Sequence, residues 1–169
     1  MGKAEHEGEA RKSPGPIPYA AIAVSDSRTA ATDESGPLVT RLLDEAGHLL
    51  QGRALIRNDA AAIQAEVRRW LHEGARLVVL AGGTGAGQRD ITVEAVRPLL
   101  DKELEGFGEL FRALSFQEIG ATAMLSRALL GLNQGRVIVC LPGSAAAIRL
   151  ALTKLLIPEL SHLLWVAGR

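Results

Sequence analysis

Apolar residues occur along this chain in two patterns, short continuous runs and longer segments in which they recur every three or four positions. The first pattern predicts buried strands, and the second predicts helices with one apolar face. We expect strands over residues 19–24, 49–56, 77–81, 129–132 and 136–141. We expect helices over residues 35–46, 60–73, 92–100, 106–120, 144–156 and 158–165. Because strands and helices alternate, the sheet should be mostly parallel, with helices on both of its faces.

Two features complete the expected architecture. Asn133-Gln134-Gly135 separates the last two apolar runs and has the composition of a tight hairpin turn, which adds one antiparallel strand. The fold class is therefore α/β, a three-layer αβα arrangement, and residues 19–169 should form a single domain. Residues 1–18 are polar, rich in Gly and Pro, and without periodicity. They predict a flexible arm, or an arm that orders against a partner subunit.

Charge and composition narrow the class of partner. Nineteen basic and nineteen acidic side chains give a formal net charge of zero, which argues against nucleic acid or a membrane as a partner. The single cysteine, Cys140, lies in an apolar run, so a buried structural thiol in a reducing compartment is expected. We find no leader-like segment and no apolar run near the ~20 residues that span a bilayer, which predicts a cytoplasmic protein.

The strongest candidate for chemistry is the glycine loop Gly82-Gly83-Thr84-Gly85, which directly follows the most apolar strand. Glycines let the backbone approach a ligand closely, and their N–H groups can face one anion. Thr84 offers a hydroxyl to a phosphate oxygen or a metal. In parallel sheets, ligands bind beyond the carboxyl ends of the strands, where this loop lies. A phosphorylated, nucleotide-like ligand is therefore expected, and the alternative is a tight turn without a ligand.

Two aspartates, Asp59 and Asp90, follow neighbouring predicted strands and could converge. Two carboxylates at ~4 Å repel by about 4 kcal/mol at an effective dielectric constant of about 20, so convergence would call for a cation. Oxygen ligands beside phosphates suit Mg²⁺. Each aspartate also has a structural interpretation, because Asp59 could cap the following helix and Asp90 could pair with Arg89 or cap the next turn.

Two further loops lie at the same predicted edge of the sheet. Ser25 and Asp26 end the first strand and are either turn formers or ligand contacts. Pro142-Gly143-Ser144 is a second turn from strand to helix, in which Ser144 could cap the helix or contact an anion. Thr92 follows the glycine loop and could cap the next helix. The four histidines show no ligand spacing, and we assign none of them a role.

Six short motifs occur in one order along the chain. They are Val24-Ser25-Asp26-Ser27-Arg28, Asp33-Glu34-Ser35-Gly36, the stretch from Gly82 to Thr92, Gly106-Phe107-Gly108-Glu109, Leu125-Ser126-Arg127 and Leu141-Pro142-Gly143-Ser144. Together they resemble the bacterial MoaB/MogA family of molybdenum cofactor biosynthesis, which is related to the gephyrin G domain. The resemblance extends from Tyr19 to the end of the chain, and residues 41–48 with the Ser-Asp-Ser-Arg segment resemble the MoaB branch more closely.

This resemblance implies a molybdopterin-binding domain that forms a homotrimer or a hexamer. It implies adenylylation of molybdopterin with Mg²⁺ and ATP, with release of pyrophosphate. It also implies catalytic and metal-binding roles for Asp59 and Asp90. The residues that it places at the substrates are Ser25, Asp26, Gly82, Gly83, Thr84, Gly85, Thr92, Ser126, Pro142, Gly143 and Ser144.

The chain departs from the family pattern at two positions. Ala81 stands where Ser or Thr is common, and Ala60 follows Asp59 where a second acid often occurs. The second departure leaves part of the metal shell open. It motivates an alternative function, a pterin-binding or scaffold protein that does not catalyse. A third possibility is an unrelated nucleotide-binding hydrolase or transferase that shares only the glycine loop.

Overall fold

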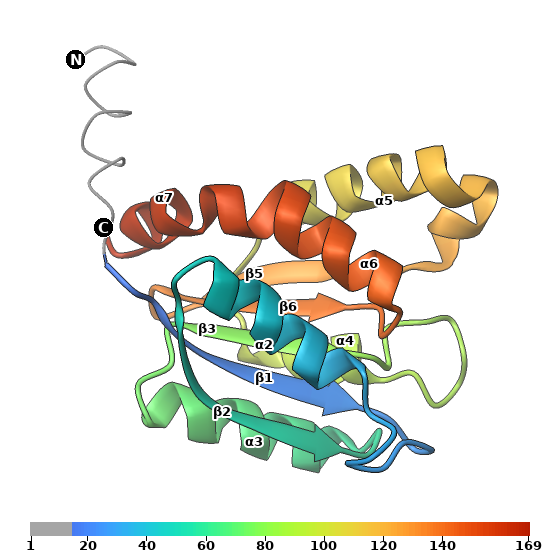
Figure 1. Ribbon diagram of the computed structural model, residues 1–169, viewed down its shortest axis with the longest axis horizontal. Coiled ribbons are helices and arrows are strands. Elements are labelled where there is room, and N and C mark those ends of the chain that lie inside the picture. The colour runs from blue at the N-terminus through green and yellow to red at the C-terminus, as the bar shows by residue number, and fades with distance from the viewer. Residues whose placement is uncertain (1–14) are drawn as a thin grey trace.

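The computed structural model describes residues 15–169, which form one six-stranded sheet in the order β2-β1-β3-β6-β5-β4 (Figure 1). The strands are β1 (Pro18–Val24), β2 (Leu49–Ile56), β3 (Leu77–Ala81), β4 (Lys102–Glu103), β5 (Leu129–Asn133) and β6 (Arg136–Leu141). β2, β1, β3 and β6 are parallel, and β5 alone runs in the opposite direction within this sheet. The mostly parallel sheet with one antiparallel strand is confirmed. The two-residue strand β4 was not predicted.

Helices cover both faces of the sheet, which confirms the three-layer prediction (Figure 1). The helical elements are α2 (Ser35–Glu45), α3 (Ala60–His72), α4 (Thr92–Val96), η1 (Arg97–Leu99), α5 (Glu105–Ile119), η2 (Gly120–Leu125), α6 (Ala145–Leu150), the π-helical η3 (Ala151–Leu156) and α7 (Ile157–Ala167). α2, α5 and the α6–α7 helix pack on one face, and α3 and α4 pack on the other.

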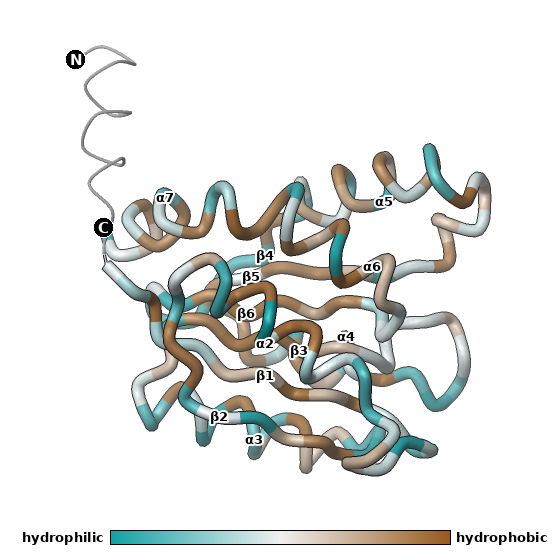
Figure 2. The backbone as a smooth tube through the Cα atoms, in the orientation of Figure 1, coloured by the Kyte–Doolittle hydropathy of each residue, from teal (hydrophilic) through white to brown (hydrophobic). Residues whose placement is uncertain are grey.

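The core is divided into two layers by the alternation of side chains along each strand. In β1, Tyr19 and Ala21 face the α2 side, whereas Ala20 and Ile22 face the α3 side. All five residues of β3 are buried, as expected for a central parallel strand. Figure 2 shows the hydrophobic colour on the central strands and on parts of the helices that cover them, and the hydrophilic colour on loops and on other turns of the helices. This sheet provides the rigid support for the loops at its carboxyl edge.

The Asp59 cap and the hairpin turn that the sequence predicts are confirmed. Gly47, with φ of +83°, ends α2, and Asp59 caps α3 by accepting a hydrogen bond from the Ala62 N–H at 2.7 Å. Gln134 and Gly135 both have positive φ, as the hairpin turn between β5 and β6 requires. The helix expected over residues 92–100 is shorter than predicted: α4 ends at Val96, and the chain continues through Pro98 as a 3₁₀ turn because proline disfavours a longer α-helix.

The last helix is longer than predicted. α6, η3 and α7 form one continuous 23-residue helix, Ala145–Ala167, in which the π-helical turn ends just before Pro158. By length and composition alone this helix could cross a membrane, although Arg149, Lys154 and Glu159 interrupt its apolar residues, so it contains no continuous apolar run of the length that spans a bilayer. Leu152, Leu156 and Leu160 are buried in the core, and the same apolar residues therefore account for its packing on the sheet.

The start of the domain differs slightly from the prediction. The domain begins before Tyr19, because Ile17 is only 1 % exposed and Pro18 already belongs to β1. The predicted arm over residues 1–18 is thus too long at its end, and residues 1–14 lie outside the described part of the chain.

Cys140 has no exposed surface, and burial raises the pKa of its thiol, as expected of a structural cysteine.

Candidate functional site

The glycine loop leaves β3 in a conformation that only glycine adopts readily. Gly82 and Gly83 have φ values of +109° and +65°. The Gly82 N–H donates to the Leu141 carbonyl at 2.9 Å, and the Gly82 carbonyl accepts from the Thr92 hydroxyl at 2.8 Å. Hydrogen bonds therefore join the loop both to the end of β6 and to the start of α4.

Thr92 supports this loop from behind and does not cap α4. Its side chain is fully buried, its hydroxyl donates to Gly82, and its N–H donates to the Gly83 carbonyl at 3.0 Å. The N-cap position of α4 is Ile91, without a side-chain cap. The prediction of Thr92 as a cap was wrong. A threonine at the start of a helix can cap it or can donate its hydroxyl to a distant carbonyl, and the sequence does not distinguish the two.

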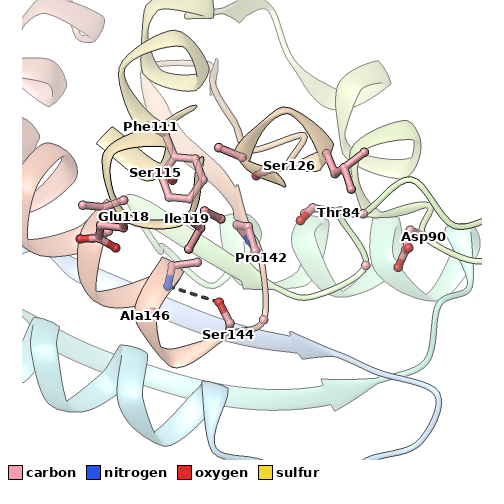
Figure 3. A pocket seen from close by; sticks show the side chains of 17 residues that line it. Thr84, Asp90, Phe111, Ser115, Glu118, Ile119, Ser126, Pro142, Ser144 and Ala146 are labelled. Atoms are coloured by element: carbon pink, nitrogen blue, oxygen red, sulfur yellow. Dashed lines mark hydrogen bonds between the residues drawn. The ribbon is translucent and has the colours of Figure 1, made fainter. Parts of the chain in front are cut away.

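A cavity of about 380 Å³ lies beside the glycine loop (Figure 3). Its walls come from the β3–α4 loop, from α5 and η2, from the turn after β6, and from α6. At one end lie Thr84 and Asp90, and at the other lie the α5 side chains Phe111, Ser115 and Ile119 (Figure 3). The cavity thus has one end with the glycine loop and the Asp90 carboxylate, and an α5 end where apolar side chains surround the Ser115 hydroxyl and the Glu118 carboxylate.

The glycine loop wraps closely around the carboxylate of Asp90. The Gly87 N–H donates to Asp90 Oδ2 at 3.0 Å. A Cβ atom at Gly85 or Gly87 would lie only 2.8 or 2.7 Å from the same oxygen. These two glycines therefore allow a negative charge to be held within the glycine loop. A charge in that position requires a cationic counterpart when an anionic ligand binds.

Two serines line the cavity in different ways. Ser144 caps α6 by accepting from the Ala147 N–H at 3.3 Å, so the cap and the cavity wall coincide at one residue. Ser126 Oγ is buried and has no hydrogen-bond partner among the described residues. A buried hydroxyl without a partner is costly, and a ligand in the cavity would supply one.

Comparisons with known proteins identify the family. Residues 20–162 match the model of the probable molybdopterin binding domain. The chain belongs to this family. It is 44% identical over 165 residues to molybdenum cofactor biosynthesis protein B of Bacillus cereus, covering 96% of each chain. It is 46% identical over 151 residues to the protein of that name from Staphylococcus carnosus, covering 88% of this chain and 89% of the relative.

Solved structures agree. A crystal structure of molybdenum cofactor biosynthesis protein B superposes with a TM-score of 0.89 at 44% identity, covering 94% of this chain and 99% of that chain. The tungsten cofactor synthesizing protein MoaB from Pyrococcus furiosus gives 0.84 at 35% identity, covering 92% and 99%. A MogA structure gives 0.79 at 27% identity, covering 89% and 99%. The higher identities to B proteins confirm the predicted similarity to the MoaB branch.

This molybdopterin binding domain brings most of the predicted site residues together. The predicted residues that line the cavity are Gly83, Thr84, Gly85, Asp90, Ser126, Pro142, Gly143 and Ser144. Gly82 and Thr92 hold the loop without lining the cavity. The loops after β3 and β6 thus meet as the edge rule for parallel sheets predicts.

Besides Gly82 and Thr92, three further predicted residues lie outside the cavity wall: Ser25, Asp26 and Asp59. Ser25 accepts hydrogen bonds from the Ser27 and Arg28 N–H groups, which is a turn-forming role. Asp26 Oδ1 accepts from the Asn58 N–H at 3.0 Å, and Asp59 caps α3. Their participation in binding, and the metal-binding role of Asp59, stay predictions.

The side chains present fit a magnesium ion shared with a ligand, and they do not form a closed metal cage. In residues 15–169 no three His, Cys, Asp or Glu side chains are grouped to hold a metal. Mg²⁺ in proteins is commonly held by one or two carboxylates together with substrate phosphates and water. Asp90 at the glycine-loop end of the cavity is suited to that arrangement.

Sequence reasoning missed the end of the cavity that α5 lines. Phe111, Ser115 and Glu118 lie on one side of α5 and line it. Their spacing of four and three residues was a usable signal. It was interpreted only as a helix face that packs on the core, and the buried Phe111 does pack there as well.

Proposed function

We propose that this protein works in cytoplasmic molybdenum cofactor biosynthesis by binding molybdopterin in this cavity and adenylylating it with Mg²⁺ and ATP. One observation carries the proposal: a single cavity joins a glycine loop holding Asp90 to apolar walls from α5 and α6. Molybdopterin combines a phosphate with a pterin ring, so both halves of the cavity find a counterpart. The full-length similarity to molybdenum cofactor biosynthesis B proteins supports the same pathway.

The proposed reaction transfers the adenylyl group of ATP to the phosphate of molybdopterin. The terminal phosphate oxygen of molybdopterin attacks the α-phosphorus of ATP and forms a new P–O bond. The bond from that phosphorus to the oxygen bridging to the β-phosphate breaks, and pyrophosphate leaves with those electrons. The attacking phosphate is already anionic at neutral pH, so no side chain needs to remove a proton from it.

The titratable side chains of the cavity wall are two carboxylates, Asp90 beside the glycine loop and Glu118 at the α5 end. No histidine or cysteine of the described residues lines it. The remaining contributions are alignment of the two phosphates and neutralisation of their charge. The amides of Gly83 and Gly85, the Thr84 hydroxyl and the first turn of α6 after Ser144 are placed to provide both.

Asp90 would hold a magnesium ion at the glycine-loop end, and the ion would neutralise phosphate charge when bound. Asp59 is the second proposed ligand. Its carboxylate already accepts a bond from the first turn of α3, which leaves its second oxygen as the available donor. The metal shell would be completed by phosphate oxygens and water.

A second candidate function is binding of molybdopterin without catalysis. It is favoured by one observation, the position of Asp59 outside the cavity wall as a helix cap, with Ala60 beside it in place of a second acid. A protein with a single carboxylate at the phosphates would bind pterin but would hold the metal weakly.

Incubation of the purified protein with molybdopterin, Mg²⁺ and ATP is expected to release pyrophosphate in a molybdopterin-dependent manner. Pyrophosphate is measured with a coupled assay, and the control omits molybdopterin. Binding of molybdopterin by calorimetry without pyrophosphate release would instead establish the second candidate. Absence of both would contradict the proposed substrate.

We also propose that the protein is a homotrimer or hexamer. Large apolar side chains are unusually exposed along α5 and η2, among them Phe116 at 61%, Ile119 at 58% and Met124 at 76%. Such a patch is typical of an interface. Light scattering is expected to give three or six times the mass of the 17.9 kDa chain, and Phe116→Glu with Met124→Glu is expected to lower it. A monomeric wild-type protein would contradict the proposal.

A further inference from the structure

Arg127 belongs to the ordered motifs of the sequence but has no role in the site described so far. It follows η2 and precedes β5. Its guanidinium is hydrogen-bonded to the back of the glycine loop: Nε donates to the Gly85 carbonyl at 3.0 Å and to the Thr84 carbonyl at 3.3 Å. Nη2 donates to the Asp90 carbonyl at 2.7 Å. One side chain therefore contacts the loop before and after its exposed tip.

These contacts determine which way the loop amides face. In a planar trans peptide the C=O and the following N–H point in opposite directions. Holding the carbonyls of Thr84 and Gly85 toward Arg127 therefore turns the next two N–H groups away from the guanidinium. The third contact, to the Asp90 carbonyl, fixes the backbone that carries the cavity carboxylate.

Glu94 orients the guanidinium from the other side. It lies on α4, one turn after Asp90, and both Nη atoms of Arg127 contact its carboxylate, Nη2 at 3.2 Å. The hydrogen bond from Arg127 lowers the pKa of Glu94, so the pair is ionised at neutral pH. Arg127 thus connects three elements: the glycine loop, α4 and the segment leading into β5.

We propose that Arg127 is a positioning residue that fixes the β3–α4 loop in its phosphate-binding conformation, with Glu94 holding its guanidinium in place. The inference rests on the proposed function for the identity of the phosphates, but the loop geometry is independent of it. Lysine could not replace Arg127, because an ammonium on a flexible stem does not present the planar fork that reaches three carbonyls and a carboxylate together.

Hydrogen exchange measured by mass spectrometry tests the positioning directly. In Arg127→Ala and Arg127→Lys, amides of residues 84–90 are expected to exchange about tenfold faster or more, because the loop loses the guanidinium's bonds to three carbonyls and keeps only backbone and Thr92 contacts. The matched control is Arg97→Ala, which removes a bidentate pair with Glu103 at 2.8 and 3.2 Å but no contact to the loop. Wild-type exchange of the loop in Arg127→Ala would overturn the proposal.

Steady-state kinetics then separate positioning from general destabilisation. Arg127→Ala is expected to raise KM for Mg·ATP about tenfold and to lower kcat as well, whereas Arg97→Ala should change neither. Glu94→Gln should lie between wild type and Arg127→Ala, since the carbonyl contacts remain. Equal kinetic losses in Arg127→Ala and Arg97→Ala would contradict a specific role. If the wild-type protein releases no pyrophosphate, the proposed function fails, and hydrogen exchange still decides the role of Arg127.

Discussion

Asp90→Asn is expected to lower molybdopterin-dependent pyrophosphate release by about 10²–10³-fold, equivalent to about 2.7–4 kcal/mol of transition-state stabilisation. Asparagine has the same shape, and its carbonyl oxygen can still accept the bond from Gly87 N–H that Asp90 Oδ2 accepts now. The loop should therefore keep its conformation while the negative charge is lost. The measurement is kcat/KM for ATP at saturating molybdopterin and several Mg²⁺ concentrations.

A matched control for this substitution lies at the opposite edge of the sheet. Asp101 also accepts a backbone hydrogen bond, from the Gln134 N–H in the β5–β6 turn, and does not line the cavity. Asp101→Asn should leave pyrophosphate release unchanged. A wild-type rate in Asp90→Asn would exclude Asp90 from the chemistry, whereas equal losses in both variants would indicate a general effect of removing a carboxylate.

Asp59→Asn is the companion measurement for the second proposed ligand. Asparagine caps helices as well as aspartate does, so α3 should remain intact. Because Asp59 lies outside the cavity wall, its loss should reduce the rate less than the loss of Asp90 does. A larger effect of Asp59→Asn would mean that Asp59, and not Asp90, holds most of the metal charge.

The parts of the fold that were predicted correctly are those in which burial leaves a strong pattern. β3 is apolar at all five positions because both of its faces are covered. β4 was missed for the converse reason, since Lys102 and Glu103 are exposed and pair with β5 only through the backbone. The continuous helix across Pro158 was missed because a π-helical turn accommodates the proline, and no residue type signals such a turn.

In the site, too, some features leave a pattern in the sequence and others do not. That the glycine loop and Asp90 lie at the cavity could be predicted, because a cluster of glycines directly after a buried strand is typical of a loop that approaches a ligand closely. Asp59 and Thr92 were ambiguous because one oxygen can cap a helix, support a loop or bind a ligand, and only tertiary structure selects among these. Arg127 was visible as part of a motif, but its hydrogen bonds to Thr84 and Asp90 span about 40 residues of sequence separation and leave no local pattern.

Gly82→Ala is expected to destabilise the protein by about 3–5 kcal/mol, which combines the cost of a positive φ with that of a steric clash. Gly82 has φ of +109°, and a Cβ atom there would lie 2.2 Å from the Val24 carbonyl oxygen. That oxygen is backbone at the end of β1, so it cannot rotate aside as a side chain would. Either β1 shifts or the Gly82 N–H loses its bond to Leu141.

Gly47→Ala separates the two costs. Gly47 has a similar φ of +83°, but nothing lies within 4 Å of the position of its missing Cβ. Its replacement should cost only the dihedral penalty, about 1–2 kcal/mol. Urea unfolding at one fixed protein concentration gives both free energies, since assembly makes stability depend on concentration. Equal losses in the two variants would mean that the end of β1 yields to the methyl group and that the glycine loop is not held rigidly between β1 and β6.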